Sequence, residues 1–523
     1  MAQIQVSGLS FHYEGSYDDV FENVSFSIDT RWKLGFIGRN GKGKTTFLRL
    51  LQGRYPYTGT ITGGTVCDYF PYEMPQEEND ATAFDLMEQW KPGVESWRVL
   101  IEMDSLGVPA ELLYRSFRTL SFGERTKLML AVLFSGENDF LLIDEPTNHL
   151  DREAREVVKQ YLRGKEGFIL VSHDRDLLDA VIDHVLVLNR KNIEVQSGNF
   201  SSWWENKEKK DAFARAENEK HLKEIKKLKA AADTAARWAE KNENTKIGFD
   251  PLKEHDRFLD TRAYIGAKTK KMQSRVKNFQ NRIGREIEEQ EGLLEDIEQV
   301  RSLKLEPLVH PKKRLVSAAD FTVRYGMEDP VFAPLTFEVR QGEKVFLQGE
   351  NGSGKSTVIK SILSRISETQ YAGGRFPYNL EAFRQAAMPE GSLQVAGNMI
   401  VSYIDQDTTG LTGSLRAYAA AYGLDITLFF TLLRYLDFER VQFEKDLQDL
   451  SEGQKKKVLI AASLMTPAHL YIWDEPMNYI DVFSRMQIEE LLGKIHPTMI
   501  IVEHDVRFLE KFADKVVLIG IPG

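Results

Sequence analysis

The feature that most constrains the fold of this chain is a pattern that occurs twice, far apart in the sequence. The segments Lys33–Leu51 (KLGFIGRNGKGKTTFLRLL) and Lys344–Leu363 (KVFLQGENGSGKSTVIKSIL) each read as an apolar strand, a glycine-rich turn and a helix. Both match G-x-x-x-x-G-K-[ST], the phosphate-binding P-loop, whose backbone N–H groups converge on phosphate oxygens at a helix N-terminus. A chance glycine turn would explain one match. Two matches in the same context predict two P-loop domains.

The P-loop pattern assigns a role to each residue type. Lys44 and Lys355 would reach the β- and γ-phosphates, and Thr45 and Ser356 would ligate Mg²⁺. The residues expected to bind ATP in the two loops are Gly38, Asn40, Gly41, Gly43, Lys44, Thr45 and Thr46, and Gly349, Asn351, Gly352, Gly354, Lys355, Ser356 and Thr357.

A second pair of matching segments follows the P-loops. FLLIDEPTNHLD and LYIWDEPMNYID each read as a buried strand that ends in two carboxylates. The first carboxylate, Asp144 or Asp474, suits Mg²⁺ coordination. The second, Glu145 or Glu475, is placed to polarise a water for attack on the γ-phosphate. Helix capping is the alternative, but it does not explain an Asp-Glu-Pro triplet at matching distances from two P-loops.

Two further pairs of segments complete the repeat. LSFGERTKLMLAVLF begins at Leu120 and LSEGQKKKVLIAASLM begins at Leu450, and each places a serine and a glycine at a helix N-terminus, where anions bind. Strands that end in His-Asp place His173 and His504 where an imidazole can hydrogen-bond a γ-phosphate. The residues of the predicted second phosphate sites are Ser121, Gly123, Ser451 and Gly453.

These four motifs, twice and in the same order, resemble two ATP-binding-cassette (ABC) domains in one chain. The resemblance implies an α/β fold with two tandem ABC-type nucleotide-binding domains, whose ATP sites form between the domains. Lys44 would then share a nucleotide with Ser451, and Lys355 with Ser121. The catalytic residues that the resemblance implies are Glu145, Glu475, His173 and His504.

Further positions extend the resemblance or depart from it. Tyr13 and Tyr325 stand where the family stacks an aromatic ring on adenine, with core packing as the alternative for a lone tyrosine. Gln406 stands where a glutamine senses Mg²⁺ and the attacking water, whereas Tyr72 occupies the matching position of the first domain. Phe122 replaces a usual glycine in the first signature. The two ATP sites are therefore expected to be unequal.

The segment between the repeats has a helical character. Apolar residues recur at spacings of three and four from Ile225 to Ala235 and from Met272 to Ile287, which predicts a two-helix hairpin with arms of ~30 residues. Gly248 and Pro251 interrupt the pattern at its tip, at about residues 242–266. We therefore expect domains at residues 1–203 and 305–523, joined by a linker at residues 204–304.

The returning arm of this hairpin begins with a basic island. Arg257–Arg285 holds nine Lys or Arg and one acid, in a chain of 78 acids and 68 bases. A solvated helix face is the alternative, but bases of one sign find few i,i+4 partners. Bases beside apolar and aromatic side chains suit folded RNA. The residues expected to bind RNA are Phe258, Leu259, Arg262, Lys268, Lys270, Lys271, Arg275 and Lys277.

The composition limits the cellular compartments and the kinds of partner that are expected for this chain. Cys67 is the single cysteine, which excludes a disulfide framework and any multi-cysteine zinc site and fits a reducing cytoplasm. No apolar run is long enough to span a bilayer, and no signal peptide is visible. We therefore expect a cytoplasmic protein without a membrane partner.

Two cassettes, a helical linker and the absence of a membrane segment resemble the ABC-F proteins, which act on ribosomes. The stretches LYIWDEPMNYIDVF and DTRAYIGA are similar to the Lsa-type branch, which protects ribosomes from antibiotics. The resemblance implies an ATPase that uses ATP and Mg²⁺, a monomer with intramolecular cassette pairing, and hydrolysis coupled to ribosome release. Its partner would be the bacterial 70S ribosome, at the exit site, the P-site tRNA and 23S rRNA, with no DNA partner.

The function that the resemblance implies is displacement of lincosamide, pleuromutilin and streptogramin A antibiotics by a linker, the P-site tRNA interaction motif, that approaches the peptidyl-transferase centre. A housekeeping ABC-F factor that acts on stalled ribosomes is the nearest alternative, because it shares every catalytic motif. The soluble ATPase of a transporter is a further alternative, but it leaves the basic hairpin without a role. A DNA-repair ATPase with zinc modules is excluded by the single Cys67.

Overall fold

A computed structural model describes residues 3–13, 19–63, 66–73, 81–136, 140–148, 150–188, 192–247, 278, 282, 307–327, 329–367 and 380–520. The chain divides into two compact units. One comprises Met1–Ser201 and Ser302–Gly523, and the other comprises Ser202–Arg301. We call residues 3–201 the first cassette and residues 307–520 the second cassette.

The first cassette is built on a six-stranded sheet with the order β5-β6-β7-β3-β8-β9. All neighbouring strands are parallel except β8 and β9, which are antiparallel. The strands are short and apolar, as expected where both faces of a parallel sheet are buried. Their bounds are Cys67–Phe70 (β5), Phe140–Asp144 (β6), Phe168–Val171 (β7), Lys33–Ile37 (β3), His184–Leu188 (β8) and Ile193–Ser197 (β9).

The second cassette repeats this arrangement in a five-stranded parallel sheet with the order β14-β15-β16-β12-β17. The strands are Val401–Ile404 (β14), Leu470–Asp474 (β15), Met499–Val502 (β16), Lys344–Gln348 (β12) and Lys515–Leu518 (β17). The order matches β5-β6-β7-β3-β8 strand for strand. The predicted α/β fold with two tandem P-loop domains is therefore confirmed.

Helices follow the core strands at the positions that the repeat predicts. After the P-loops come α1 (Lys44–Leu51) and α9 (Lys355–Leu363). The other helices that follow core strands are α5 (Arg152–Arg163), α6 (Arg175–Val181), α14 (Val482–Lys494) and α15 (Val506–Phe512).

Each cassette also has an antiparallel sheet and a helical region. The antiparallel strands are Gln3–Phe11 (β1), Phe21–Asp29 (β2) and Thr58–Thr62 (β4), and Arg314–Tyr325 (β10), Leu335–Arg340 (β11) and Ala387–Val395 (β13). The helical region of the first cassette comprises α2 (Ala83–Trp90), α3 (Ser96–Ser105), η1 (Ala110–Tyr114), η2 (Phe117–Thr119) and α4 (Phe122–Phe134). In the second cassette, α10 (Leu380–Ala386) precedes β13, and the helical region comprises α11 (Leu415–Ala421), α12 (Ile426–Tyr435), η4 (Arg440–Glu444), η5 (Leu447–Asp449) and α13 (Glu452–Met465).

The core strands separate two apolar layers, which β12 illustrates. Val345 and Leu347 pack into the cluster that includes the antiparallel sheet, whereas Phe346 packs into the cluster that includes the helical region. This alternation follows from the two-residue period of a strand. Because both faces of the sheet are filled, polar side chains gather where the parallel strands end, and the candidate sites lie at these ends.

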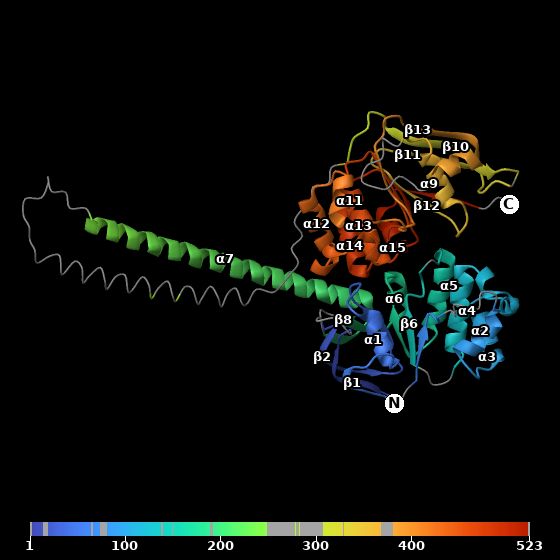
Figure 1. The fold of residues 1–523 in the computed structure, drawn as a ribbon, viewed down its shortest axis with the longest axis horizontal. Coiled ribbons are helices and arrows are strands. Elements are labelled where there is room, and N and C mark those ends of the chain that lie inside the picture. Colours follow the sequence, from blue (N-terminus) through green and yellow to red (C-terminus); the bar gives the residue numbers. More distant parts are fainter. Residues whose placement is uncertain are drawn as a thin grey trace, which may run out of the picture. The chain divides into compact units, whose positions relative to one another are not determined.

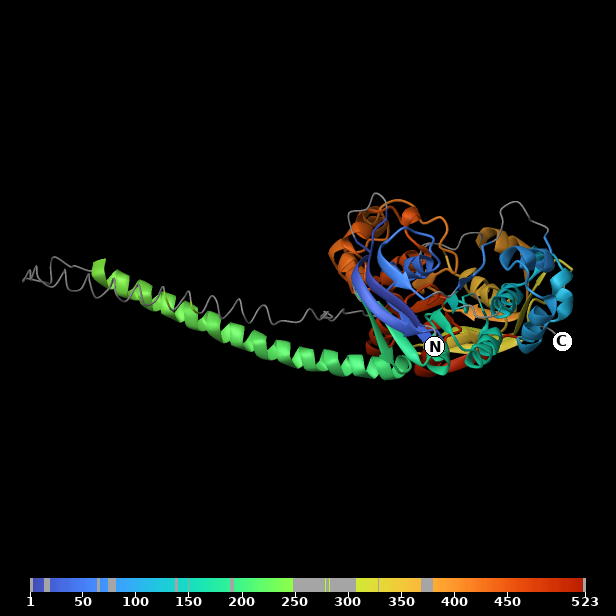
Figure 2. The same ribbon diagram turned by 90° about the horizontal axis from the view of Figure 1, so that it is seen from below.

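The linker unit begins with one long helix, α7 (Phe200–Ile247), which runs without a break in Figures 1 and 2. Its 48 residues correspond to ~72 Å at 1.5 Å per residue. The helix is longer than the predicted arm and includes residues 242–247, which the sequence analysis placed in the tip. Residues 242–247 contain no glycine or proline, and the first strong helix breaker is Gly248.

The predicted RNA-binding residues belong to the part of the linker that follows α7. Of the returning arm, the structure describes Asn278 and Arg282, and both are helical. All eight predicted RNA-binding residues, from Phe258 to Lys277, lie outside the described residues. Within the described part of the chain, no helix is both long enough and apolar enough to cross a membrane.

Candidate active sites between the cassettes

The two P-loops adopt backbone conformations that require glycine. Gly43 and Gly354, which cap α1 and α9, have φ angles of +104° and +94°. At Gly43 an added Cβ would also lie 2.5 Å from a methyl carbon of Val20. At Gly41 and Gly352 an added Cβ would meet no atom within 4 Å, so each loop has open space on that side. Each loop therefore ends at a helix N-terminus with room for a phosphate group.

The P-loop lysines fold back onto their own loops. Lys44 Nζ donates to the carbonyl oxygen of Gly38, and Lys355 Nζ donates to those of Gly349 and Glu350, both at 2.8 Å. Both side chains are buried, and burial lowers the pKa of each ammonium group. Phosphate oxygens would replace these carbonyl acceptors and supply the negative charge that the buried ammonium groups favour.

The residues expected to hold Mg²⁺ lie together in both cassettes. Thr45 Oγ1 donates to Asp144 Oδ2 at 2.7 Å, and Ser356 Oγ donates to Asp474 Oδ2 at 3.0 Å. Burial raises the pKa of Asp144, and burial and the neighbouring Glu475 raise the pKa of Asp474 to about 7. Asp474 Oδ1 is buried without a hydrogen-bond partner. A hard cation with oxygen ligands fits this set of donors and would satisfy the unpaired oxygen.

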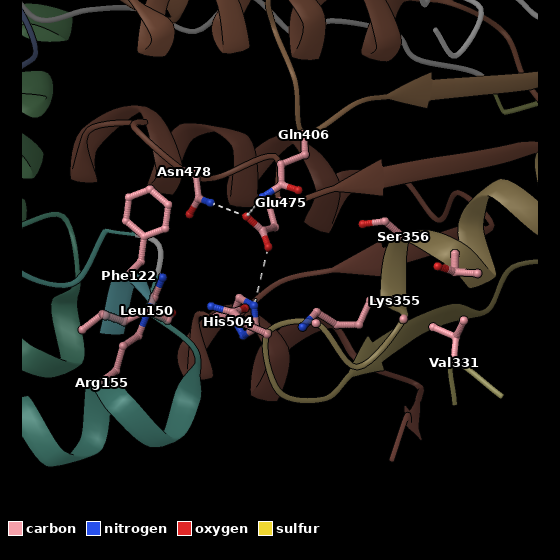
Figure 3. A pocket seen from close by; sticks show the side chains of 14 residues that line it. Phe122, Leu150, Arg155, Val331, Lys355, Ser356, Gln406, Glu475, Asn478 and His504 are labelled. Atoms are coloured by element: carbon pink, nitrogen blue, oxygen red, sulfur yellow. Dashed lines mark hydrogen bonds and ion pairs between the residues drawn. The ribbon is translucent and has the colours of Figure 1, made fainter. Parts of the chain in front are cut away.

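In the second cassette, two amides hold the carboxylate of Glu475 (Figure 3). Gln406 Nε2 and Asn478 Nδ2 both donate to Glu475 Oε2, at 2.8 Å and 2.6 Å, and His504 Nε2 lies 3.7 Å from Oε1. Burial alone would raise the pKa of Glu475. The contacts with His504 and the charge of Lys355 outweigh burial, so the pKa lies below its ordinary value. Glu475 is therefore ionised at neutral pH, as a general base requires.

The equivalent carboxylate of the first cassette has different surroundings. His173 Nε2 lies 3.2 Å from Glu145 Oε1. Burial and the charge of Asp144 raise the pKa of Glu145 to about 8. Burial also lowers the pKa of His173 well below its usual range. Glu145 is therefore mostly protonated at neutral pH.

Tyr72 stands at the position that matches Gln406. Its hydroxyl donates to Asp68 Oδ2 at 2.7 Å, and its ring stacks on Trp90 with the centroids 5.2 Å apart. Another tyrosine approaches the first site, because Tyr69 donates its hydroxyl to Asp144 Oδ2 at 3.0 Å. The expectation that the two sites differ agrees with this geometry.

The first P-loop lies against the second cassette. Asn40 Nδ2 donates to the carbonyl oxygen of Tyr479 at 2.8 Å. An added Cβ at Gly453 would lie 3.2 Å from the same Asn40 nitrogen. The structure therefore brings the P-loop of Lys44 next to the signature segment that contains Ser451.

Two ion pairs strengthen this contact on one side only. Arg39 pairs with Asp437, and Lys42 pairs with Glu439, in the segment that precedes η4. The sequence does not repeat the four charges at the other interface, where the corresponding residues are Glu350, Ser353, Gly107 and Pro109. These two pairs therefore distinguish the first P-loop from the second.

The second P-loop opens on a cavity of about 420 Å³ that residues of both cassettes line (Figure 3). The second cassette contributes Val331, Asn351, Gly352, Gly354, Lys355, Ser356, Thr357, Gln406, Glu475, Asn478 and His504. The first cassette contributes Phe122, Leu150 and Arg155. The structure therefore brings the site of Lys355 next to the first signature segment, through Phe122 rather than through Ser121.

The signature serines start their helices, as the sequence predicts. Ser121 Oγ accepts from the Glu124 backbone N–H at 3.2 Å, and Ser451 Oγ accepts from that of Gln454 at 3.4 Å. The Glu124 and Gln454 side chains accept in return from the serine N–H groups at 2.7 and 3.0 Å, so both ends are capping boxes. The LSxG[EQ] pattern thus has a local structural role, and phosphate binding by these serines remains a prediction.

The two adenine-stacking candidates occupy different environments. Tyr13 is 43% exposed, and its hydroxyl forms a 2.6 Å hydrogen bond with Thr46 Oγ1 beside the first P-loop. Tyr325 is half-buried and makes an edge contact with Phe383, and it does not line the cavity. Val331 lines the cavity instead. Stacking on adenine remains a prediction for both tyrosines.

Sequence reasoning missed several residues that line the cavity. Asn478 lies inside the DEPMNYID segment, so its three-residue separation from Glu475 was a usable signal. Phe122 was noted only as a departure from the family pattern. Leu150 lies inside the FLLIDEPTNHLD segment, whereas Arg155 and Val331 belong to no motif. Packing between segments that are distant in sequence places all three in the site.

Comparisons with known proteins support the resemblance. The family model described as "ABC transporter" matches residues 21–148 and 332–478, more than half of the chain. The chain is 28% identical to the ribosome protection protein VmlR of Bacillus subtilis (strain 168), and the match covers 98% of this chain and 86% of VmlR. It is 25% identical to a probable ATP-binding cassette sub-family F member 3 homolog of Encephalitozoon cuniculi (strain GB-M1), over 94% and 76% of the two chains.

A solved structure has a similar fold. The archaeal ribosome recycling factor aABCE1, in complex with the archaeal ribosomal stalk protein aP1, matches with a TM-score of 0.56 and 18% identity, over 98% of this chain and 87% of that chain. At this identity the likeness shows the fold alone. Because the family model matches more than half of its residues, the chain belongs to the ABC transporter family and carries the ATP-binding domain twice, which implies an ATPase.

Proposed function

We propose that this protein is an ABC-F ATPase that binds ATP and Mg²⁺ at two sites between its cassettes and acts on the bacterial ribosome. The observation that carries the ATP proposal is that each P-loop lies against the signature segment of the other cassette. Asn40 is beside Gly453 on one side, and Phe122 lines the cavity of Lys355 on the other. Composite sites of this kind would draw the cassettes together when nucleotide binds.

Each residue around the second cavity has its own role in ATP hydrolysis. Lys355 and the P-loop N–H groups bind the phosphates. Ser356 and Asp474 would hold Mg²⁺, which would neutralise phosphate charge. Glu475 accepts a proton from the attacking water. His504 lies near enough to Glu475 to orient the same water or the γ-phosphate. In the first site the corresponding roles belong to Lys44, Thr45, Asp144, Glu145 and His173.

The ribosome proposal rests on likeness along the whole chain. The match to VmlR, a ribosome protection protein by name, covers 98% of this chain and so includes the linker. The 48-residue helix α7 is long enough to present the linker tip at a distance of ~70 Å from its start. We propose that the linker reaches the P-site tRNA and the peptidyl-transferase centre, and that hydrolysis releases the protein from the ribosome.

The finer proposal is antibiotic resistance of the Lsa type. In it, the linker displaces lincosamide, pleuromutilin or streptogramin A antibiotics, and the basic island contacts RNA through the predicted residues from Phe258 to Lys277. The protein would act as a monomer, because the two cassettes pair within one chain. It would act in the cytoplasm, where ribosomes translate.

A reconstituted bacterial translation reaction tests this proposal. A lincosamide is added at a concentration that stops reporter synthesis, and the purified full-length protein is added with ATP. We expect reporter synthesis to recover with the native protein and not with a Lys44→Ala/Lys355→Ala control. Recovery of stalled ribosomes in the absence of drug, with none in its presence, would favour the housekeeping factor instead. No effect in either reaction would contradict a role on the ribosome.

A further inference from the structure

The second ATP site contains an amide that none of the predicted roles uses. We infer that Asn478 is a positioning residue for the general base Glu475, and that it leaves Glu475 Oε1 as the oxygen that accepts the proton of the attacking water. The inference rests on the proposed ATPase function, which it deepens by assigning the orientation of the base.

The hydrogen bonds of Glu475 distinguish its two carboxylate oxygens. Oε2 accepts from Asn478 Nδ2 at 2.6 Å and from Gln406 Nε2 at 2.8 Å, which occupies both of its lone pairs. Oε1 lies 3.7 Å from His504 Nε2, a distance longer than a hydrogen bond. Oε1 is therefore the carboxylate oxygen with free capacity to accept a proton from water. Without Asn478, Gln406 would be the one side chain of the described residues that still hydrogen-bonds this carboxylate.

Asn478 is itself held in place. Its side chain is 8% exposed and lines the cavity next to Glu475 (Figure 3). The backbone is fixed on both sides, because the Met477 N–H donates to Glu503 Oε2 at 3.2 Å and the Tyr479 carbonyl accepts from Asn40 at 2.8 Å. Tyr479 also has a φ of +64°, an uncommon value for a residue other than glycine. An amide fixed in this way can hold a neighbouring carboxylate in one orientation.

The first cassette lacks this arrangement and so provides a matched control. Asn148 is the counterpart of Asn478, three residues after Glu145. Its backbone N–H donates to the Glu145 carbonyl at 3.4 Å, but within the described residues no amide side chain hydrogen-bonds the Glu145 carboxylate. The same asparagine is therefore present in both motifs, but in the described residues only the Asn478 side chain hydrogen-bonds the carboxylate of its base.

The test uses the full-length protein with Glu145→Gln, so that only the second site hydrolyses ATP. In this background we would measure kcat and KM for Asn478→Ala and for Asn478→Asp, which keeps the shape of the side chain but removes the donor. We expect kcat to fall between about tenfold and a hundredfold, as for a misplaced catalytic group, with KM changed by less than about threefold. The control Asn148→Ala should keep kcat within about twofold.

A double-mutant cycle separates positioning from a merely structural role. In the same background, single-turnover hydrolysis is measured for Glu475→Gln with and without Asn478→Ala. Because Asn478 acts through Glu475, we expect no further loss from Asn478→Ala once the base is gone. A further loss of the same size as before would overturn the inference, and so would an unchanged kcat in Asn478→Ala alone.

The same measurements distinguish failure of this inference from failure of the proposed function. If the Glu145→Gln protein hydrolyses ATP but responds equally to Asn478→Ala and Asn148→Ala, only the role of Asn478 is refuted. If the Glu145→Gln protein and the native protein hydrolyse no ATP, with or without ribosomes, the ATPase proposal fails and the inference fails with it. Equilibrium binding of ATP to each variant confirms that the loss lies in the chemical step.

Discussion

Replacing Asp481 with asparagine should destabilise the second cassette far more than the same replacement of Asp151 destabilises the first. Asp481 Oδ2 lies 2.7 Å from Lys457 Nζ, and the two side chains are 0% and 4% exposed. The pair joins α13, the signature helix, to the start of α14. Asp481 also caps α14 by accepting from the Ser484 N–H at 2.9 Å. Asparagine keeps the capping oxygen but removes the charge.

The magnitude follows from the burial of the pair. Removing one partner of a buried ion pair leaves an uncompensated charge and costs ~3–5 kcal/mol. Asp151 caps α5 in the same way, through the Ala154 N–H at 2.9 Å. Lys127 is the counterpart of Lys457, six residues after the signature serine, but no ion pair joins Lys127 to Asp151 among the described residues. Asp151→Asn should therefore cost less than ~1 kcal/mol, since asparagine is a comparable N-cap.

Hydrogen exchange followed by mass spectrometry suits this measurement, because it reports each cassette separately in a chain that need not unfold in one step. We expect faster exchange in peptides of α13 and α14 for Asp481→Asn, and little change in α4 and α5 for Asp151→Asn. Adding Lys457→Met to Asp481→Asn should recover most of the loss, because no unpaired charge is then buried. Equal effects of the two asparagine substitutions, or additive losses in the double variant, would refute the reasoning.

Three other predictions concern the two sites and pH. Burial and the charge of Asp144 raise the pKa of Glu145 to about 8, so its carboxyl group is mostly protonated at pH 7. Glu475→Gln should therefore slow ATP hydrolysis more than Glu145→Gln, and a shift from pH 7 to pH 9 should raise the residual rate of the Glu475→Gln protein. Charge reversal by Arg39→Glu breaks the ion pair with Asp437 and should raise, by about tenfold, the ATP concentration at which half of the molecules close. Labels on the two cassettes report this closing, and adding Asp437→Arg to the same chain should return the ATP concentration to its original value. Burial alone would raise the pKa of Asp481, but Lys457 holds this pKa below its ordinary value. The ion pair therefore stabilises the fold above about pH 4 and loses that effect at lower pH. Acid unfolding of the native and Asp481→Asn proteins measures this difference.

The parts of the fold and sites that could be predicted are those encoded by short local patterns. A P-loop needs a strand, glycines and a helix start in one stretch, so the positions of Lys44 and Lys355 follow from the sequence. Thr45 and Asp144 are both predicted to bind Mg²⁺, and the hydrogen bond between them is compatible with a shared ion.

Other features depend on packing that no local pattern records. Phe122, Leu150 and Arg155 enter the second site only because one cassette packs on the other. The environments of Glu145 and Glu475 differ through Tyr72, whose side chain turns toward Asp68, a contact that the sequence does not specify. α7 continues to Ile247, beyond the point where the apolar periodicity ends, because the first strong helix breaker is Gly248.

Co-sedimentation with ribosomes tests the central claim most directly. The Glu145→Gln/Glu475→Gln protein is designed to bind ATP without hydrolysing it, and it is centrifuged with bacterial 70S ribosomes through a sucrose cushion, with and without ATP. We predict that the protein pellets with ribosomes only when ATP is present, and that binding weakens as salt rises because phosphate contacts are screened. Absence of the protein from the ribosome pellet at low salt, when ATP binding has been confirmed separately, would contradict the account.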